Sequence, residues 1–335
     1  MPRRETRIVM AREVLQISLK KIVVDYDFRN DTDQDVTTEV AFPIPSYEND
    51  WHQQSISADS FSDFRLQIDG KPFQFLSESK ATMTGKDVTA ILAADKIDIA
   101  SFGHFEELSD GNTKIHDLAR LPVNEQKRLV ALGLFHDLDV NQPTADWTVH
   151  LQYHWTQRFP AHSTVHIRHE YTPVAGYAAI PGEGAAQLLL EAGKIPADEA
   201  KPKPLNPNDL GDISSFCLGT PLAKIMAASF PQQSPNAQTD VNSDSILLLD
   251  WVDFILTSAN TWKQPIKDFS LVIERPQPRQ GGKMLISFCS PANGEVEKTD
   301  VNLFQVHLTN FVPVSELHIG FFEVPQAKAA QPAKK

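Results

Sequence analysis

Residues 22–30 read Ile-Val-Val-Asp-Tyr-Asp-Phe-Arg-Asn, and residues 36–42 read Val-Thr-Thr-Glu-Val-Ala-Phe. In both stretches apolar side chains alternate with polar ones. An extended chain with this period places its apolar side chains on one face, so the pattern predicts two half-buried strands. Residues 30–33, Asn-Asp-Thr-Asp, are turn formers. We therefore predict an antiparallel hairpin at this position.

The same period recurs further along the chain. Residues 64–68 alternate before the turn pair Asp69-Gly70, which predicts a second hairpin. Strands are also predicted at residues 147–155 and 164–171, and the short connection between them suits a long hairpin. We expect a mainly β fold, with an antiparallel β-sandwich in the N-terminal region and a second strand-rich region after it.

Two stretches break this strand pattern. Residues 87–133 carry helix formers with apolar side chains three and four positions apart, which predicts a helical insertion. Residues 195–211 hold four prolines among charged residues, which disfavours regular structure. We predict four parts: an N-terminal β-sandwich at 1–194 containing the insertion, a proline-rich linker at 195–211, a strand-rich region at 212–326, and a disordered tail at 327–335.

Composition excludes several classes of partner. The 31 basic and 43 acidic residues give a net charge of -12, which opposes binding to nucleic acid or anionic lipid. A membrane-spanning helix needs roughly 20 apolar residues, and the most apolar stretch, 246–256, is interrupted by Asp250 and Asp253. We expect no nucleic-acid partner and no membrane span. The first residues also lack the apolar core of a signal peptide.

Seven motifs occur in order along the chain: Val24-Asp-Tyr-Asp-Phe-Arg-Asn-Asp-Thr32, Asp35-Val-Thr-Thr-Glu-Val-Ala-Phe-Pro-Ile-Pro45, Trp155-Thr-Gln-Arg-Phe-Pro160, His169-Glu-Tyr-Thr-Pro173, Phe254-Ile-Leu-Thr-Ser-Ala-Asn-Thr-Trp-Lys-Gln-Pro-Ile266, Asp268-Phe-Ser-Leu-Val272 and Ser287-Phe-Cys289. Together they resemble the bacterial domain-of-unknown-function family 4424 over nearly the whole chain. The resemblance implies an exported protein, periplasmic or secreted, whose signal peptide is missing from this sequence. It carries over no catalytic residue, because the family has no assigned activity. The layout is more weakly similar to vault and inter-alpha-trypsin-type sandwich modules.

The resemblance also bears on the two cysteines, Cys217 and Cys289. Their spacing matches no metal or redox motif, so the sequence alone leaves open a reduced pair or a single bridge. The family places cysteines at both positions, and an exported protein meets an oxidising compartment. The resemblance therefore implies a disulfide between Cys217 and Cys289, with two buried free thiols as the alternative.

Four side chains on the strands at 147–155 and 164–171 offer a cluster of metal-ligand types. They are His150, His154, His166 and Glu170, and a zinc or copper ion could bind them across a hairpin. The solvated polar face of an alternating sheet contains such residues as well. We predict no metal site and no cofactor.

The most distinctive loop contains Asn260, Trp262 and Pro265, which could line a ligand groove. The alternative is a loop that closes the end of the sandwich with Trp262 in the core. The pair Asp250 and Asp253 does not suggest glycoside hydrolysis, because a spacing of three on a strand puts the carboxylates on opposite faces.

These observations leave two function hypotheses. The first is a noncatalytic binding or structural protein outside the cytoplasm, whose partner is an envelope protein or a cell-surface polymer. The second is an extracytoplasmic hydrolase with a site between the two strand-rich regions. A deep polar pocket with perturbed titratable groups would favour the hydrolase. A flat apolar or aromatic patch would favour binding.

Overall fold

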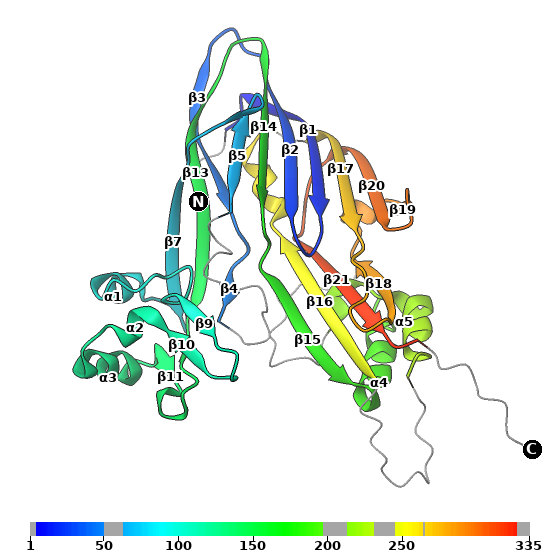
Figure 1. Cartoon of the computed structure of the whole chain (residues 1–335). Helices are drawn as coiled ribbons and strands as arrows, with labels where there is room; N and C mark the ends of the chain where they lie inside the picture. The colour runs from blue at the N-terminus through cyan, green and yellow to red at the C-terminus, as the bar shows by residue number, and fades with distance from the viewer. Residues whose placement is uncertain (1–4, 50–62, 197–212, 231–244, 264, 327–335) are drawn as a thin grey trace, which may run out of the picture.

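The structure is a computed structural model that describes residues 5–49, 63–196, 213–230, 245–263 and 265–326 (Figure 1). The fold is mainly β, as predicted. The described strands form sheets of eight, five and four strands and two short two-stranded ribbons. The predicted tail and all of the predicted linker beyond residue 196 lie outside the described residues.

The largest sheet consists of β1 (Ile8–Ile17), β2 (Ile22–Asn30), β5 (Arg65–Ile68), β6 (Lys71–Pro72), β14 (Ser163–Tyr171), β17 (Ile266–Glu274), β19 (Glu297–Lys298) and β20 (Leu303–Phe311). Its order is β19-β20-β17-β1-β2-β14-β5-β6. The hairpin predicted around Asp69-Gly70 is confirmed as β5 and β6, and both turn residues have the positive φ that a tight hairpin turn requires.

One neighbouring pair in this sheet departs from the antiparallel prediction. Strands β1 and β17 run parallel, with Glu13 beside Phe269. The sheet therefore joins strands from the predicted N-terminal and C-terminal regions. The division at residues 195–211 remains a prediction.

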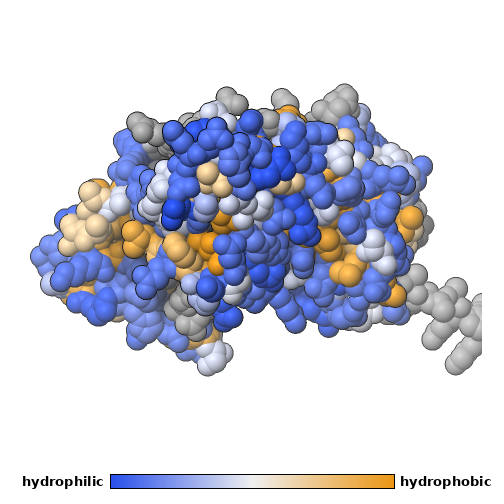
Figure 2. All heavy atoms as spheres, turned by 90° about the horizontal axis from the view of Figure 1, so that it is seen from above, coloured by the Kyte–Doolittle hydropathy of each residue, from blue (hydrophilic) through white to orange (hydrophobic). Residues whose placement is uncertain are grey.

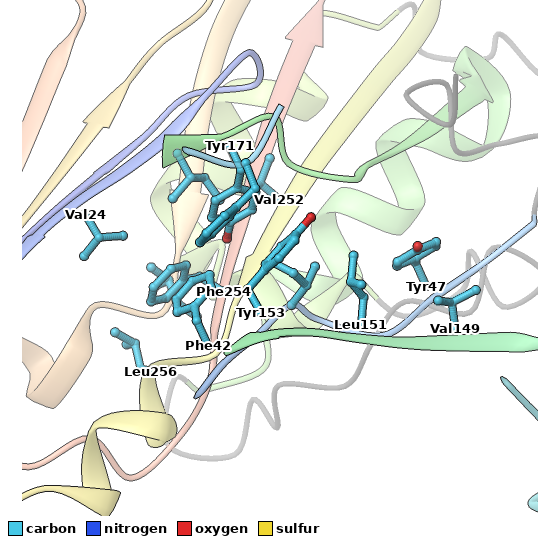
Figure 3. Close-up of a cluster of buried hydrophobic side chains, with 14 of the residues drawn as sticks. Val24, Phe42, Tyr47, Val149, Leu151, Tyr153, Tyr171, Val252, Phe254 and Leu256 are labelled. Atoms are coloured by element: carbon cyan, nitrogen blue, oxygen red, sulfur yellow. The ribbon is translucent and has the colours of Figure 1, made fainter. Parts of the chain in front are cut away.

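The five-stranded sheet consists of β3 (Val36–Pro43), β4 (Tyr47–Glu48), β7 (Leu76–Met83), β8 (Lys86–Asp87) and β13 (Thr148–Phe159). Strand β13 is at its centre, between β3 and β7. Its burial alternates residue by residue, with Val149, Leu151 and Tyr153 buried. In Figure 3 these three side chains leave the strand on the same side, and Tyr153 lies near Tyr171 of the larger sheet. The two sheets thus pack face to face.

Two predicted hairpins are wrong for the same reason. Strand β2 lies in the eight-stranded sheet and β3 in the five-stranded sheet, so the turn at residues 30–33 connects two facing layers. Strands β13 and β14 are likewise split between the two sheets. Alternating burial is the same for adjacent and for facing strands, so the period alone does not distinguish the two arrangements.

Polar side chains connect the two crossings at one end of the sandwich. The Asn30 side-chain amide donates to the carbonyls of Gln34 and Phe159, at 2.8 and 3.0 Å. The Asp35 carboxylate accepts from the Ala161 amide at 2.8 Å and from the Arg158 Nε at 2.9 Å. The connection after β2 is thereby hydrogen-bonded to the connection after β13.

The third sheet is covered on both faces. It consists of β15 (Ala175–Pro181), β16 (Ile246–Phe254), β18 (Lys283–Phe288) and β21 (Leu317–Val324), and every residue of β21 is buried. Helices α4 (Gly182–Ala192) and α5 (Gly219–Ala227), together with the short helix η2 (Ser214–Phe216), pack on one face. Val252 and Phe254 belong to the main core instead; in Figure 3 Phe254 appears beside Phe42, and Val252 appears near Tyr171.

The insertion is mixed rather than purely helical. It contains α1 (Thr89–Ala94), α2 (His116–Ala119) and α3 (Val123–Ala131), but also β9 (Phe105–Glu107) and β10 (Thr113–Ile115). It continues past residue 133 through β11 (Phe135–His136), η1 (Leu138–Val140) and β12 (Thr144–Ala145). Figure 1 places this unit beside the lower end of β7 and β13. Across the described ranges, no helix has the length and apolar character needed to cross a bilayer.

A glycine is required where β15 crosses the indole of Trp251. Gly176 lies opposite Trp251 in the sheet, and a Cβ at this glycine would be 1.8 Å from a ring carbon. We predict that G176A lowers the free energy of unfolding by about 2–3 kcal/mol because the ring must move in a packed region.

The matched variant is G184A, on an exposed position of α4 where a Cβ meets no atom within 4 Å. It should raise the free energy of unfolding by up to about 1 kcal/mol. Urea unfolding of both variants measures the difference, and equal effects would contradict the packing argument.

Candidate functional site

The three residues of the predicted groove lie at the end of η3 (Leu256–Thr261) and just after it. The Asn260 side-chain amide donates to the Pro313 carbonyl at 2.9 Å. Trp262 is only 9% exposed, and its ring centroid is 4.5 Å from that of Phe28. Pro265 is half-buried before β17. Of the three, Trp262 alone lines a cavity inside the sandwich.

This cavity lies between the eight- and five-stranded sheets and has a volume of about 30 Å³. Most of the residues around it are apolar or aromatic, but Glu13 of β1, His169 of β14 and Trp155 of β13 also line it. All three are at least 94% buried. Ser258 and Ala259 of η3 close it beside Trp262. The cavity therefore lies between strands of the N-terminal region and a segment of the C-terminal region.

A β-bulge puts the Glu13 carboxyl inside. The pairing of β1 with β2 slips between Met10 and Arg12, so the alternation changes face at this point. Met10 and Glu13 then share the inner face, while Arg12 is exposed and pairs with Asp27 at 3.8 Å. Without the bulge, strict alternation from Met10 would turn Arg12 inward.

His169 is inside because β14 alternates without interruption. It shares the inner face with Ile167 and Tyr171, and its ring centroid is 4.0 Å from that of Phe42 and 5.5 Å from that of Tyr26. Both of its ring nitrogens are buried and have no hydrogen-bond partner in the structure.

Burial keeps both titratable groups neutral. Removal from water raises the pKa of Glu13 to about 8 and lowers that of His169 to about 3. The pKa of Tyr26 is raised well above its usual value, first by burial and then by Glu13 and Tyr171, and burial also raises the pKa of Tyr171. At neutral pH the cavity therefore presents a protonated carboxylic acid as a donor and a neutral imidazole.

The sequence contains a signal for both groups that residue-type motifs do not capture. Glu13 shares a face with Leu15 and Ile17, and His169 occupies the apolar face that holds Ile167 and Tyr171. A polar residue within an otherwise apolar face is the informative feature. The bulge that determines the face of Glu13 is not visible in the alternation alone.

A second hollow lies in the insertion, and it is larger and open to solvent. Its volume is about 370 Å³. Apolar side chains, among them Ile115, Leu118 and Leu138, form part of the lining. The polar part of the lining is contributed by Asn112, Thr113, Lys114, Gln126 and Asn141. Within this pocket, all of whose lining residues are described, no carboxylate contributes.

Hydrogen bonds to backbone carbonyls hold the rim of this open pocket in place. The Thr113 amide donates to the Asn141 carbonyl at 3.2 Å, and the Thr113 hydroxyl donates to the Pro143 carbonyl at 2.9 Å. The Gln126 side-chain amide donates to the Leu121 carbonyl at 2.9 Å. The two Thr113 bonds connect β10 to the segment before β12, and the Gln126 bond fixes α3 to the turn that precedes it.

The structure separates the four residues considered as metal ligands. His150 and His154 are on the outer face of the five-stranded sheet, whereas His166 and Glu170 are on the outer face of the eight-stranded sheet. The idea that they could meet across a hairpin is wrong, because β13 and β14 are in different layers. His154 contacts Glu39 at 3.0 Å, and the two nitrogens of His166 contact Asp25 and Asp27. Among described residues, no group of three or more metal-ligand side chains is arranged to hold an ion.

Asp250 and Asp253 have separate partners. Asp250 is 2.8 Å from Arg279, and burial raises its pKa to about 6. Asp253 is 2.7 Å from the Nδ1 of His318. The two carboxylates thus take part in different contacts of the four-stranded sheet.

Cys217 and Cys289 are bonded as a disulfide in the structure, with their Cα atoms 5.0 Å apart. Cys217 follows η2, and Cys289 follows β18. The bond fastens the segment before α5 to the edge strand of the four-stranded sheet. The neighbouring Ser287 hydroxyl donates to the Phe216 carbonyl at 2.8 Å across the same contact.

Comparison with known proteins identifies a family. A family model described as Domain of unknown function (DUF4424) matches residues 3–319. The chain belongs to this family. The DUF4424 match covers nearly the whole sequence, in agreement with the motifs that run from Val24 to Cys289. None of the curated proteins matches the sequence.

Among solved structures, the DUF4424 chain is similar to the crystal structure of a candidate nutrient-binding protein from Legionella pneumophila subsp. pneumophila. The TM-score is 0.40 and the sequence identity 13%, over 96% of this chain and 68% of that chain. Nothing about the ligand of the DUF4424 chain follows from that likeness.

Because Glu13 and His169 are both neutral in the folded chain, we predict a pH range in which they leave the free energy of unfolding unchanged. In the unfolded chain, Glu13 is protonated only below about pH 4.5 and His169 only below about pH 6.5. In the folded chain, Glu13 is protonated and His169 is neutral between about pH 3 and 8, so the two groups together bind one proton. Between pH 4.5 and 6.5 both states therefore bind one proton and these two groups give no pH dependence. From 6.5 to 8 folding takes up a proton, so the free energy of unfolding falls with rising pH, by about 2 kcal/mol. From 4.5 down to 3 the unfolded state binds the extra proton, so it falls with falling pH.

Urea unfolding of the wild type and of E13Q over this range tests the assignment. E13Q should lose the alkaline decline, and its acidic decline should begin near pH 6.5 instead of 4.5, because the His169 proton of the unfolded chain is then no longer balanced by Glu13. Parallel curves above pH 6.5 would show that Glu13 is not the buried acid.

The disulfide predicts a second change in stability. The bond closes a loop between residues 72 positions apart. We predict that the double variant C217S/C289S lowers the free energy of unfolding by about 4 kcal/mol, from the chain entropy of the unfolded state. Urea unfolding with and without reductant provides the control. Reductant should lower the free energy of unfolding of the wild type and leave that of the double variant unchanged. A wild type whose free energy of unfolding does not change in reductant would contradict the prediction.

Proposed function

We propose that this protein is a noncatalytic binding protein that works outside the cytoplasm, in the periplasm or after secretion, and that the open pocket of the insertion takes a small polar ligand such as a unit of a cell-surface polymer. The observation that carries the proposal is this pocket of about 370 Å³. Small-molecule sites are typically concavities of about 300–1,000 Å³ with an apolar lining and a few polar groups.

The chemistry of the lining supports a polar ligand that is neutral or negatively charged. Amide side chains at Asn112, Gln126 and Asn141 contain donors and acceptors, and the Thr113 hydroxyl, whose proton is donated to the Pro143 carbonyl, can still accept a hydrogen bond. Lys114 adds a single positive charge. Hydroxyl-rich units, such as those of saccharides, and small carboxylates match this set of groups, and the apolar side chains exclude water from their remaining surface.

The disulfide supports the proposed compartment. Cys217 and Cys289 are bonded, and such bonds persist chiefly in oxidising compartments. The family resemblance, which implies exported proteins, agrees with this proposal. The net charge of -12 favours solubility and opposes general binding to anionic surfaces.

The second candidate function, an extracytoplasmic hydrolase, is favoured by one observation. The cavity between the two strand-rich regions holds Glu13 and His169, whose pKa values are strongly shifted. Its volume of about 30 Å³ matches water and not a substrate. Binding in the open pocket is therefore the better-supported proposal.

The binding proposal predicts the effect of filling the pocket. Ala119 lines the pocket and is exposed, so the variant A119W should place an indole in it. We expect A119W to weaken ligand binding at least about tenfold, because loss of the contact costs at least about 1.4 kcal/mol. The ligand is first identified by saturation-transfer NMR of the wild type against cell-surface oligosaccharides and small carboxylates, and affinity is then measured by calorimetry.

The matched control is A131W, which adds the same bulk at an exposed position of α3 outside the pocket. It should bind as the wild type does. Equal affinity of A119W and the wild type would overturn the assignment of the pocket. Turnover of any of these compounds that is lost in E13Q would favour the hydrolase instead.

A further inference from the structure

The buried cavity contains more hydrogen-bonding capacity than its own side chains satisfy. Oε2 of Glu13, both ring nitrogens of His169 and Nε1 of Trp155 are buried and have no partner in the structure. All three side chains line the same cavity. They come from three strands: Glu13 from β1, His169 from β14 and Trp155 from β13. A buried polar group without a partner costs about 1–3 kcal/mol, so three in one place call for an occupant.

The size and chemistry of the cavity limit what the occupant can be. A site needs at least ~10–15 Å³ of such volume to hold one water, so about 30 Å³ has room for about two waters. The indole N–H of Trp155 only donates, which disfavours a cation. An anion would be opposed by the Glu13 carboxyl as soon as that group ionises. A water molecule both donates and accepts, so it fits an indole donor, a carboxyl group and an imidazole together.

We propose that this cavity is a water-binding site in which one or two buried waters connect Glu13, His169 and Trp155 and so join the two facing sheets by hydrogen bonds. The water accepts from the Trp155 indole, which belongs to the five-stranded sheet. It also bonds to the Glu13 carboxyl and the His169 imidazole, which belong to the eight-stranded sheet.

The proposed water lies between the two facing sheets, where directional contacts would fix how one sheet sits on the other. Around the cavity the contacts between these faces are made largely by apolar or aromatic side chains such as Phe28, Phe42 and Trp262, and the Asn30 bond to the Phe159 carbonyl lies at the end of the sandwich. Apolar packing is non-directional, whereas a hydrogen-bonded water fixes the offset of one layer relative to the other. The water site therefore adds directional contacts between the two layers.

Water-edited NMR of the full chain tests the proposal. The indole N–H of Trp155 is assigned by its disappearance in W155F. It should show a cross-peak to water with the sign of a long-lived bound molecule, unlike the transient hydration of a surface. The control variant is Q157L, two residues along the same strand. The Gln157 Oε1 is also buried without a partner, but the residue does not line the cavity. Q157L should leave the Trp155 cross-peak unchanged.

Variants at Glu13 and a crystal structure supply independent readouts. E13Q keeps a donor and an acceptor and should retain the cross-peak, whereas E13L should lose it or weaken it severalfold. A crystal structure of the wild type should show water density within hydrogen-bond distance of all three side chains, and this readout needs no variant to fold. An empty cavity, a direct bond between Glu13 and His169, or density of an organic molecule would each overturn the proposal.

Discussion

The structure depends on the packing of two alternating faces against each other. The eight- and five-stranded sheets each bury one side, and the described chain crosses between them at 31–35, at 73–75 and at 160–162. Asn30 and Asp35 hold the first and the last of these crossings together through bonds to the Phe159 carbonyl and the Ala161 amide. Because these two crossings are held at one end, the facing layers keep a fixed separation. Figure 2, which views the molecule from this end, shows a mostly hydrophilic surface with apolar groups in separate patches.

The sequence predicted where strands occur better than it predicted which strands lie next to one another. Alternation located β2, β3, β13 and β14, since period-two burial is a local property. It did not reveal that β2 and β3 face each other, because facing and adjacent strands bury the same residues. The parallel pairing of β1 with β17 joins segments far apart in the sequence, and no local pattern encodes it. The insertion was located at residue 87, but its short strands are too brief to show a period.

The same limit applies to the site residues: the sequence indicated some of them singly but not how they come together. Trp262 was singled out as a distinctive loop residue, and the structure places its ring against Phe28 at the wall of the buried cavity. Glu13 was missed because a β-bulge decides which way it points. The open pocket was missed because its lining comes from separate short elements of the insertion. An asparagine or glutamine in such an element cannot be recognised as a pocket residue from its type alone. Prediction from sequence therefore reached single residues but not their assembly.

The parallel contact between β1 and β17 has a consequence for biogenesis. Glu13 lies beside Phe269, so β1, which pairs with β2 on one side, acquires its second neighbour only after most of the polypeptide has been synthesised. Until then one side of β1 is an unpaired edge, and an exposed edge can recruit other chains into aggregates. Contacts so distant along the chain also slow folding. A nascent chain of this design gains from a holding chaperone until its last quarter emerges.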